Sequence, residues 1–226
     1  MRTIGLRATS DLVHQVLATT GGFARESRAL RRAARRMPKP MPWEWAEPRL
    51  MPLLSGPTFD LPGEAIVRAR SELGPMVEIG VDLGGVFTYV DAAVAQRWEC
   101  SAQQLMGSGL RNLAERAARL QASQVTGGVM SGRAIRLLRD HPHWASSLVL
   151  VPEHLLRLFG SHDQIIGAPQ KACLVSLPID TPAAFAAEII LEFEQTARRS
   201  LWLDPFVVRD GQLSWCGDTD EDDGDW

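Results

Sequence analysis

The histidines around residue 141 are the side chains in this sequence whose types and spacing could bind a metal. His141 and His143 lie two residues apart, Asp140 precedes them, and His154 and His162 follow. Two histidines at this spacing on a strand point to the same side and can share one zinc ion. However, a proline separates this pair, which indicates a turn, and neither an H-E-x-x-H motif nor a third ligand at a suitable spacing accompanies it. We therefore expect surface histidines and no metal, and keep a metal-dependent hydrolase around His141 and His143 as an alternative.

Other motifs for catalysis are missing from the sequence. Cys100, Cys173 and Cys216 are far apart and form no C-x-x-C pair, which predicts reduced thiols. The chain has no G-x-S-x-G motif, and the Asp-Leu-Gly-Gly run at 82–85 is too short for a phosphate-binding loop. The sequence therefore predicts no cofactor and favours a protein without enzymatic activity.

The composition is typical of a globular chain. Of the 226 residues, 45% are hydrophobic and 23% are charged, and the net charge is −3. This apolar content excludes a fully disordered chain, and no apolar run approaches the roughly 20 residues of a membrane-spanning helix. Asp11 and His14 interrupt the stretch that would be apolar in a signal peptide. We expect a cytoplasmic protein that spans no membrane.

Charge is distributed unevenly along the chain. Residues 1–40 contain nine Arg or Lys against two acidic residues, whereas six of the last nine residues are Asp or Glu. An asymmetry of this kind is a signal of charged partners. It predicts a basic helical segment at 1–37 and an acidic tail at 214–226, which could contact a partner or each other.

The basic segment has the pattern of an amphipathic helix over residues 25–36. Apolar residues recur at helical spacing, and arginines that include Arg28, Arg32, Arg35 and Arg36 cover most of the remaining surface. Such a helix could bind nucleic acid, anionic lipid or an acidic protein, or it could be a solvated helix that covers the core. No aromatic residues interleave with the arginines, which disfavours nucleic acid. The four arginines are candidate partner-binding residues.

A proline-rich segment follows at 38–63. Its seven prolines have no backbone N–H to donate and hold the chain extended. We therefore expect a long ordered loop or an arm that covers a sheet edge. Trp43 and Trp45 in this segment could anchor a partner or could pin the arm to its own core. Both are kept as candidate partner-binding residues, and a domain boundary is expected near residue 60.

The core domain is predicted at 64–213. In the helix that begins at Ser101, Gln104 stands at the capping-box position, and the apolar residues occupy an arc of about 140°. Hairpins outnumber β-α-β units, so we predict an α+β fold with a mostly antiparallel sheet and helices packed on it, preceded by the basic segment and the proline-rich arm. The stretch 127–132 is irregular. Strand patterns occur at 76–83, 86–90, 133–138, 145–151, 163–168, 172–177 and 206–208, and those at 163–168 and 172–177 are expected to form a hairpin. Helix patterns begin at Asp91, which can cap the helix, and at Ser101, Pro152 and Thr181.

Several of these segments carry small or polar residues at fixed places. They are the strands at 77–82 and 87–90, the Arg-Asn-Leu at 111–113, the Ala-Ser-Ser-Leu-Val-Leu-Val-Pro run at 145–152, Asp163, Pro169, and the Arg-Asp-Gly-Gln-Leu at 209–213. Together they resemble the YtpQ-like bacterial family of unknown function over about residues 70–213. The resemblance implies the same fold class and a bacterial cytoplasmic setting, and it implies no activity or catalytic residues.

These observations favour a non-enzymatic bacterial interaction protein. We expect an adaptor, a regulator or an immunity-type binder that contacts a protein partner through its charged ends. A metal-dependent hydrolase around His141 and His143 is one alternative, and nucleic-acid binding through the 25–36 helix is the other.

Overall fold

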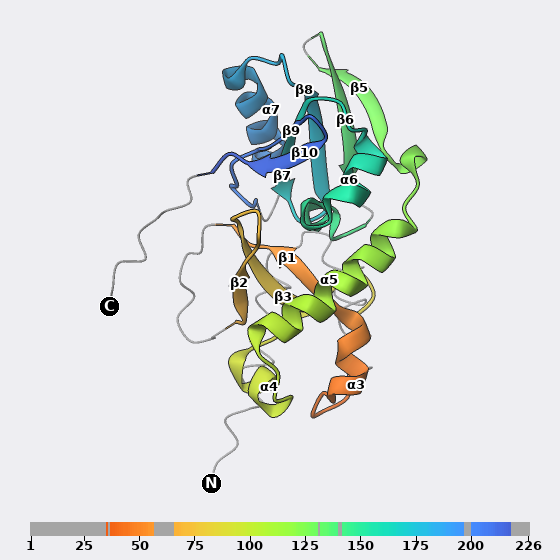
Figure 1. Cartoon of the computed structure of the whole chain (residues 1–226), viewed down its shortest axis with the longest axis vertical. Helices are drawn as coiled ribbons and strands as arrows, with labels where there is room; N and C mark the ends of the chain where they lie inside the picture. Colours follow the sequence, from red (N-terminus) through yellow and green to blue (C-terminus); the bar gives the residue numbers. More distant parts are fainter. Residues whose placement is uncertain are drawn as a thin grey trace, which may run out of the picture.

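Two antiparallel β-sheets form the frame of the molecule, the larger at the top of Figure 1 and the smaller below it. The computed structural model describes residues 35, 37–56, 66–130, 132–139, 142–196 and 200–217. Within these residues the chain has an α+β fold whose strands pair antiparallel, which confirms the predicted fold class.

The smaller sheet is built around its third strand. β3 pairs with β1 along one edge, and with β2 and β4 in succession along the other. Val77, Ile79 and Val81 of β3 are fully buried, because other elements cover this strand. The strands are β1 (Leu50–Leu54), β2 (Arg68–Arg70), β3 (Met76–Asp82) and β4 (Phe87–Tyr89).

The larger sheet has the strand order β10-β9-β7-β8-β6-β5. Its central strands β7 and β8 form the predicted hairpin and are buried along almost their whole length. Such continuous burial suits their nearly uninterrupted apolar sequences. The strands are β5 (Thr126–Met130), β6 (Arg133–Arg139), β7 (Gln164–Gln170), β8 (Cys173–Pro178), β9 (Phe206–Arg209) and β10 (Gln212–Trp215).

The long helix α5 runs across the smaller sheet beside β1 (Figure 1). It begins with the predicted capping box, in which the Ser101 hydroxyl accepts from the Gln104 amide and the Gln104 side chain accepts from the Ser101 amide. The helices are α3 (Trp43–Ala46), α4 (Ala92–Arg97), α5 (Ala102–Ala118), α6 (Pro152–Phe159) and α7 (Ala183–Thr196), with the 3₁₀ helices η1 (Glu47–Arg49), η2 (Ala122–Gln124) and η3 (Ala145–Leu150).

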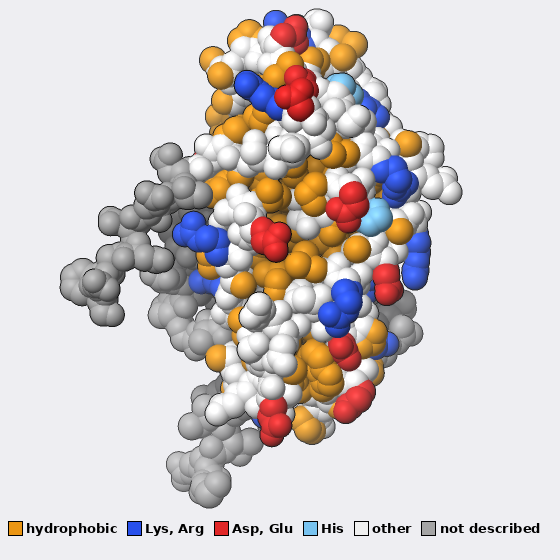
Figure 2. Space-filling view, viewed as in Figure 1, with side chains coloured by type: hydrophobic (Ala, Val, Ile, Leu, Met, Phe, Trp, Pro, Cys, Tyr) orange, Lys and Arg blue, Asp and Glu red, His pale blue; other side chains and the backbone are white. Residues whose placement is uncertain are grey.

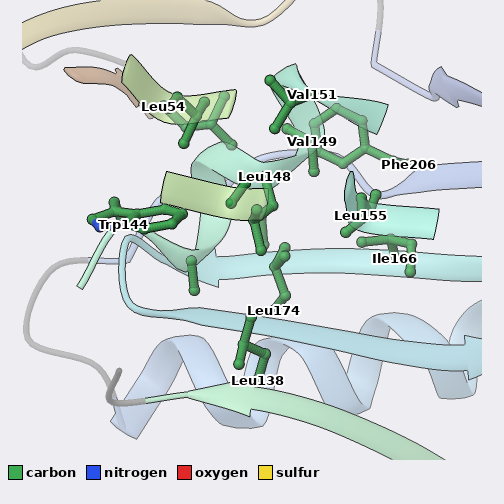
Figure 3. Close-up of a cluster of buried hydrophobic side chains, with 14 of the residues drawn as sticks. Leu54, Leu138, Trp144, Leu148, Val149, Val151, Leu155, Ile166, Leu174 and Phe206 are labelled. Carbon is green, nitrogen blue, oxygen red and sulfur yellow. The ribbon is translucent and has the colours of Figure 1, made fainter. Parts of the chain in front are cut away.

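One hydrophobic core joins the two sheets. η3 lies between them, and Leu148 and Val149 are fully buried. Figure 3 shows these side chains among Leu54 of the smaller sheet and Leu174 and Phe206 of the larger one. The two halves therefore share buried contacts and hold the surface between them in place.

Several segments differ from the sequence prediction, among them the start of the predicted acidic tail, because residues 214 and 215 belong to β10. Residues 145–151, predicted as a strand, form η3 instead, because an apolar run that is buried on all sides lacks the alternation that distinguishes a strand. The stretch 127–132, which was predicted to be irregular, contributes most of strand β5. Its two glycines disfavour an extended strand, and the pairing with β6 stabilises it. Residues 50–54 of the predicted arm are the buried strand β1.

Candidate binding groove

A groove of about 560 Å³ opens where the two halves of the molecule meet. Its walls come from β2 and the turn after it, from the first half of α5, and from the junction of η3 and α6. Figure 2 shows hydrophobic side chains gathered over the middle of one face of the molecule. The groove is lined by Ala69, Arg70, Ser71, Glu72, Leu73, Ala102, Gln103, Met106, Leu110, Leu150 and Pro152.

The floor and walls of the groove are mostly apolar. Leu73, Met106, Leu110 and Leu150 pack against the shared core and remain half-buried. A volume of this size and an apolar lining with a few polar groups are typical of ligand-binding sites. The geometry therefore suits a ligand with a sizeable hydrophobic part.

The rim beside β2 carries polar groups without a partner. Arg70 and Glu72 are exposed, and neither forms an ion pair with another described residue. The Ser71 hydroxyl is buried and has no hydrogen-bond partner among the described residues. Hydrogen bonds from the Ser71 amide to Pro75 O and from the Gly74 amide to Ser71 O hold this turn. The rim thus presents both charge signs in a fixed loop.

Arginine side chains hold α5 and α6, which supply the other two walls of the groove, in place relative to each other. Arg157 of α6 donates to Leu120 O at 2.9 Å and to Ala117 O at 2.8 Å, at the end of α5. A cation in this place stabilises the carbonyl end of a helix. Arg136 of β6 likewise donates to Phe159 O at the end of α6. These bonds tie α5, α6 and the larger sheet together.

An ion cluster also joins the two halves. Lys171, in the turn between β7 and β8, donates from Nζ to Glu78 Oε2 at 3.1 Å and to the Tyr89 hydroxyl at 2.6 Å. Arg68 reaches the other Glu78 oxygen at 3.4 Å. Glu78 is only 8% exposed, so its carboxylate is buried with two cations. We call Glu78, Lys171, Tyr89 and Arg68 the inter-sheet ion cluster.

The two tryptophans proposed as partner-binding residues lie against the smaller sheet. Trp43 packs on Trp98 with ring centroids 5.6 Å apart, and the Arg49 guanidinium lies 4.4 Å from the centre of the Trp45 ring. Both Trp43 and Trp45 are half-buried against the cluster around Ala46. The structure therefore shows that they pin this segment to its own core.

The candidate arginines fall largely outside the described part of the chain. Arg28, Arg32 and Arg36 belong to the residues that are not described, and Arg35 is exposed. The structure brings none of the described candidates into the groove: Arg35, Trp43 and Trp45 do not line it.

The histidines that could bind a metal are placed on separate elements where they are described. His143 packs on the turn at Gly85, where an added Cβ would lie 2.6 Å from its Cδ2 atom. His154 lies on α6 beside Glu153, and His162 follows α6. Among the described residues, which exclude Asp140 and His141, no three His, Cys, Asp or Glu side chains could hold a metal ion.

The three cysteines are free thiols, and Cys173 is buried. Burial raises the pKa of the Cys100 thiol, and Glu47 and Glu99 raise it further. Burial, followed by Asp204, raises the pKa of the Cys216 thiol despite the opposing effect of Arg209. A raised pKa keeps a thiol protonated at neutral pH, which is the reverse of what activates a cysteine nucleophile.

The sequence analysis did not identify the groove residues. One signal was present: the apolar arc of α5 is wider than one buried stripe, and the structure shows that its edge, Met106 and Leu110, lines the groove. The β2 wall and the η3–α6 wall come from segments that lie about 40 residues before and after α5 in the sequence. No local sequence pattern could therefore reveal the site.

Comparisons with known proteins returned no relative: no family model, no curated protein and no solved structure matches this chain. Within the described residues, no helix is long and apolar enough to cross a membrane.

Proposed function

We propose that this protein is a non-enzymatic binding protein that docks an amphipathic helix of a partner protein in the groove. The observation that supports this is a mostly apolar groove whose rim charges, Arg70 and Glu72, have no ion-pair partner among the described residues. Apolar grooves that receive one face of a helix are a recurrent mode of protein recognition.

The shape of the α5 wall favours a helix. Ala102, Met106 and Leu110 are spaced at i, i+4 and i+8, so they form a stripe about 12 Å long at 1.5 Å per residue. A helix packed along this stripe would present about two turns of apolar residues to it.

The charges on the rim set the expected polarity of the partner. Arg70 has no ion-pair partner among the described residues, so an acidic residue on the bound helix would gain one there. In this proposal the basic segment 1–37 and the acidic tail 214–226 add contacts outside the groove. The free cysteines and the resemblance to the YtpQ-like family support a bacterial cytoplasmic setting.

The experiment uses a displayed library of helical peptides, each about 20 residues long, with varied apolar faces and acidic flanks. Ala102→Glu places a carboxylate inside the groove at the first residue of α5, where it does not oppose helix formation. Ala92→Glu makes the same change at the first residue of α4, outside the groove. Peptides selected on the unmodified protein should bind Ala92→Glu equally and Ala102→Glu about ten-fold more weakly, because a carboxylate would be buried unpaired.

Two outcomes would contradict the proposal. In the first, selected peptides bind both variants with the affinity of the unmodified protein, so that the contact lies elsewhere. In the second, the library yields no peptide that binds above background. Circular dichroism and thermal unfolding check that both variants fold alike.

A further inference from the structure

Strand β5 is the end strand of the larger sheet and has one free edge. It pairs only with β6 among the described residues, and Figure 1 shows no element beyond it at this side of the sheet. Residues 126–129 are exposed, and Val129 is 75% exposed. A free edge of this kind is a template for adding another strand.

The register defines which backbone groups face outward. Met130 pairs with Arg133 across a two-residue connection, so these two residues form the closing hydrogen-bonded pair of the hairpin. Hydrogen-bonded and non-hydrogen-bonded pairs alternate along antiparallel strands. The amide and carbonyl groups of Gly127 and Val129 therefore point away from β6, toward the free edge.

The β5 edge lacks the features that usually prevent pairing. From Gln121 to Gly132 the sequence contains no charged residue and no proline, although such residues commonly protect exposed edges. The opposite edge differs, because β10 is followed in the sequence by six acidic residues within positions 218–225. Two copies meeting at β10 would bring like charges together, whereas two copies meeting at β5 would not.

The edge is also complementary to itself. A two-fold axis through Gly128 would place Gly127 opposite Val129 of the partner subunit, and each such pair would exchange two backbone hydrogen bonds. The exposed Val129 side chain would then cover a residue without a side chain. An added Cβ at Gly127 has no atom within 4 Å, so the space above it is open.

We propose that two copies of this chain associate through their β5 strands, which pair antiparallel about Gly128 and join the two six-stranded sheets into one. Five residues per strand form a small contact, so the dimer is weak and depends on concentration. No residue of β5 lines the groove, and the pairing does not depend on the proposed function.

A cysteine placed on the axis tests the register. In the proposed dimer the two Gly128 Cα atoms form a non-hydrogen-bonded pair about 4.5 Å apart, within disulfide range. A Cβ at this position lies 3.6 Å from the Ile135 side chain, which is ordinary contact. Gly128→Cys should therefore cross-link into a covalent dimer under mild oxidation. Gly127→Cys is the matched control, because its copies would be about 8 Å apart, beyond disulfide reach.

Sedimentation measures the association itself. Unmodified protein should dimerise between roughly 1 μM and 1 mM, the range of a small interface. Val129→Lys should remain monomeric, and Leu191→Lys, the same kind of change at a 39% exposed residue of α7, should dimerise normally. The proposal is overturned if the unmodified protein stays monomeric over this range, if Val129→Lys dimerises unchanged, or if Gly127→Cys cross-links as readily as Gly128→Cys.

Discussion

The groove and the inter-sheet ion cluster both lie where the two halves of the molecule meet, and they differ in how their polar groups are satisfied. In the cluster, Glu78 contacts two cations and Lys171 contacts both Glu78 and Tyr89. At the groove, Arg70 and Glu72 contact no charged partner among the described residues. The charges of the cluster are paired with one another, although Arg68 Nε has no hydrogen-bond partner among the described residues, whereas the two rim charges of the groove have no ion-pair partner among them.

This difference separates a structural role from a binding role. Burying a charge costs free energy unless it is paired, so the paired ions of the cluster are explained by the fold alone. Apolar side chains at the surface beside charges without an ion-pair partner add little to the stability of the fold. They become buried when a partner binds, which favours binding. We therefore expect changes in the cluster to affect stability, and changes in the groove to affect binding.

The largest expected effect is at Lys171. Lys171→Met leaves the buried Glu78 carboxylate with Arg68 alone, and should lower the free energy of unfolding by about 3 kcal/mol, the lower end for breaking a buried pair. Urea denaturation measures the change. Lys39→Met, at an exposed lysine, should change stability by less than about 0.5 kcal/mol. Equal stability of the two variants would remove the structural role of the cluster.

A second buried carboxylate has no cation beside it among the described residues, and it should therefore behave differently. Glu194 of α7 is 6% exposed and accepts a hydrogen bond from the Trp202 amide. Burial raises the pKa of Glu194 above its ordinary value of 4.5. Since the folded state holds this proton more tightly than the unfolded state, Glu194 contributes most to stability at low pH, and the contribution is lost as the pH rises from 4.5 through the folded pKa.

Urea unfolding at several pH values checks this sign. Glu194→Gln should remove this loss of stability and be more stable than the unmodified protein at pH 7. Glu192→Gln, on the exposed side of the same helix, should leave the pH dependence unchanged. A stability contribution of Glu194 that grows with pH would be the opposite of what its burial predicts.

At the groove, Arg70→Ala should weaken binding of an acidic helical peptide about three- to ten-fold and change stability by less than about 0.5 kcal/mol. Fluorescence anisotropy gives the dissociation constant. Glu72→Gln, at the neighbouring rim residue, should leave affinity unchanged or raise it. If instead Glu72→Gln weakens binding and Arg70→Ala does not, the expected polarity of the partner is wrong.

The smallest effects concern the α5 wall. Gly107→Ala should stabilise the protein by about 0.5–1 kcal/mol, because a Cβ there meets only the end of the Arg111 side chain, at 3.9 Å. Gly109→Ala should gain less or destabilise, since its Cβ would lie 3.1 Å from Pro52 Cδ. Thermal unfolding ranks the two. Equal stabilisation would show that β1 does not constrain α5 as closely as the structure indicates.

The sequence predicted the parts of the fold that depend on nearby residues. The capping box at Ser101, the Asp91 cap of α4 and the β7–β8 hairpin have short-range signals, and all three are present in the structure. η3 was predicted as a strand because a short apolar run that is buried on every side does not distinguish the two conformations.

The candidate site could not be predicted in the same way. The groove needs three segments that approach only in the folded chain, and the ion cluster joins Glu78 to Lys171, 93 residues away. The uneven charge predicted partner contacts at the ends of the chain. Trp43 and Trp45 predicted a contact in the proline-rich arm, but both pack on the core of the protein itself. Composition identifies such features but does not show which surfaces remain unpaired after folding.

The central claim is that the groove is the docking surface, and the most direct test follows the methionine methyl groups by NMR during titration with a selected peptide. Met106 lines the groove, whereas Met41 packs near Trp98 on the smaller sheet. The account predicts that the Met106 signal shifts with saturation while the Met41 signal stays in place. A shift of Met41 without a shift of Met106 would contradict it.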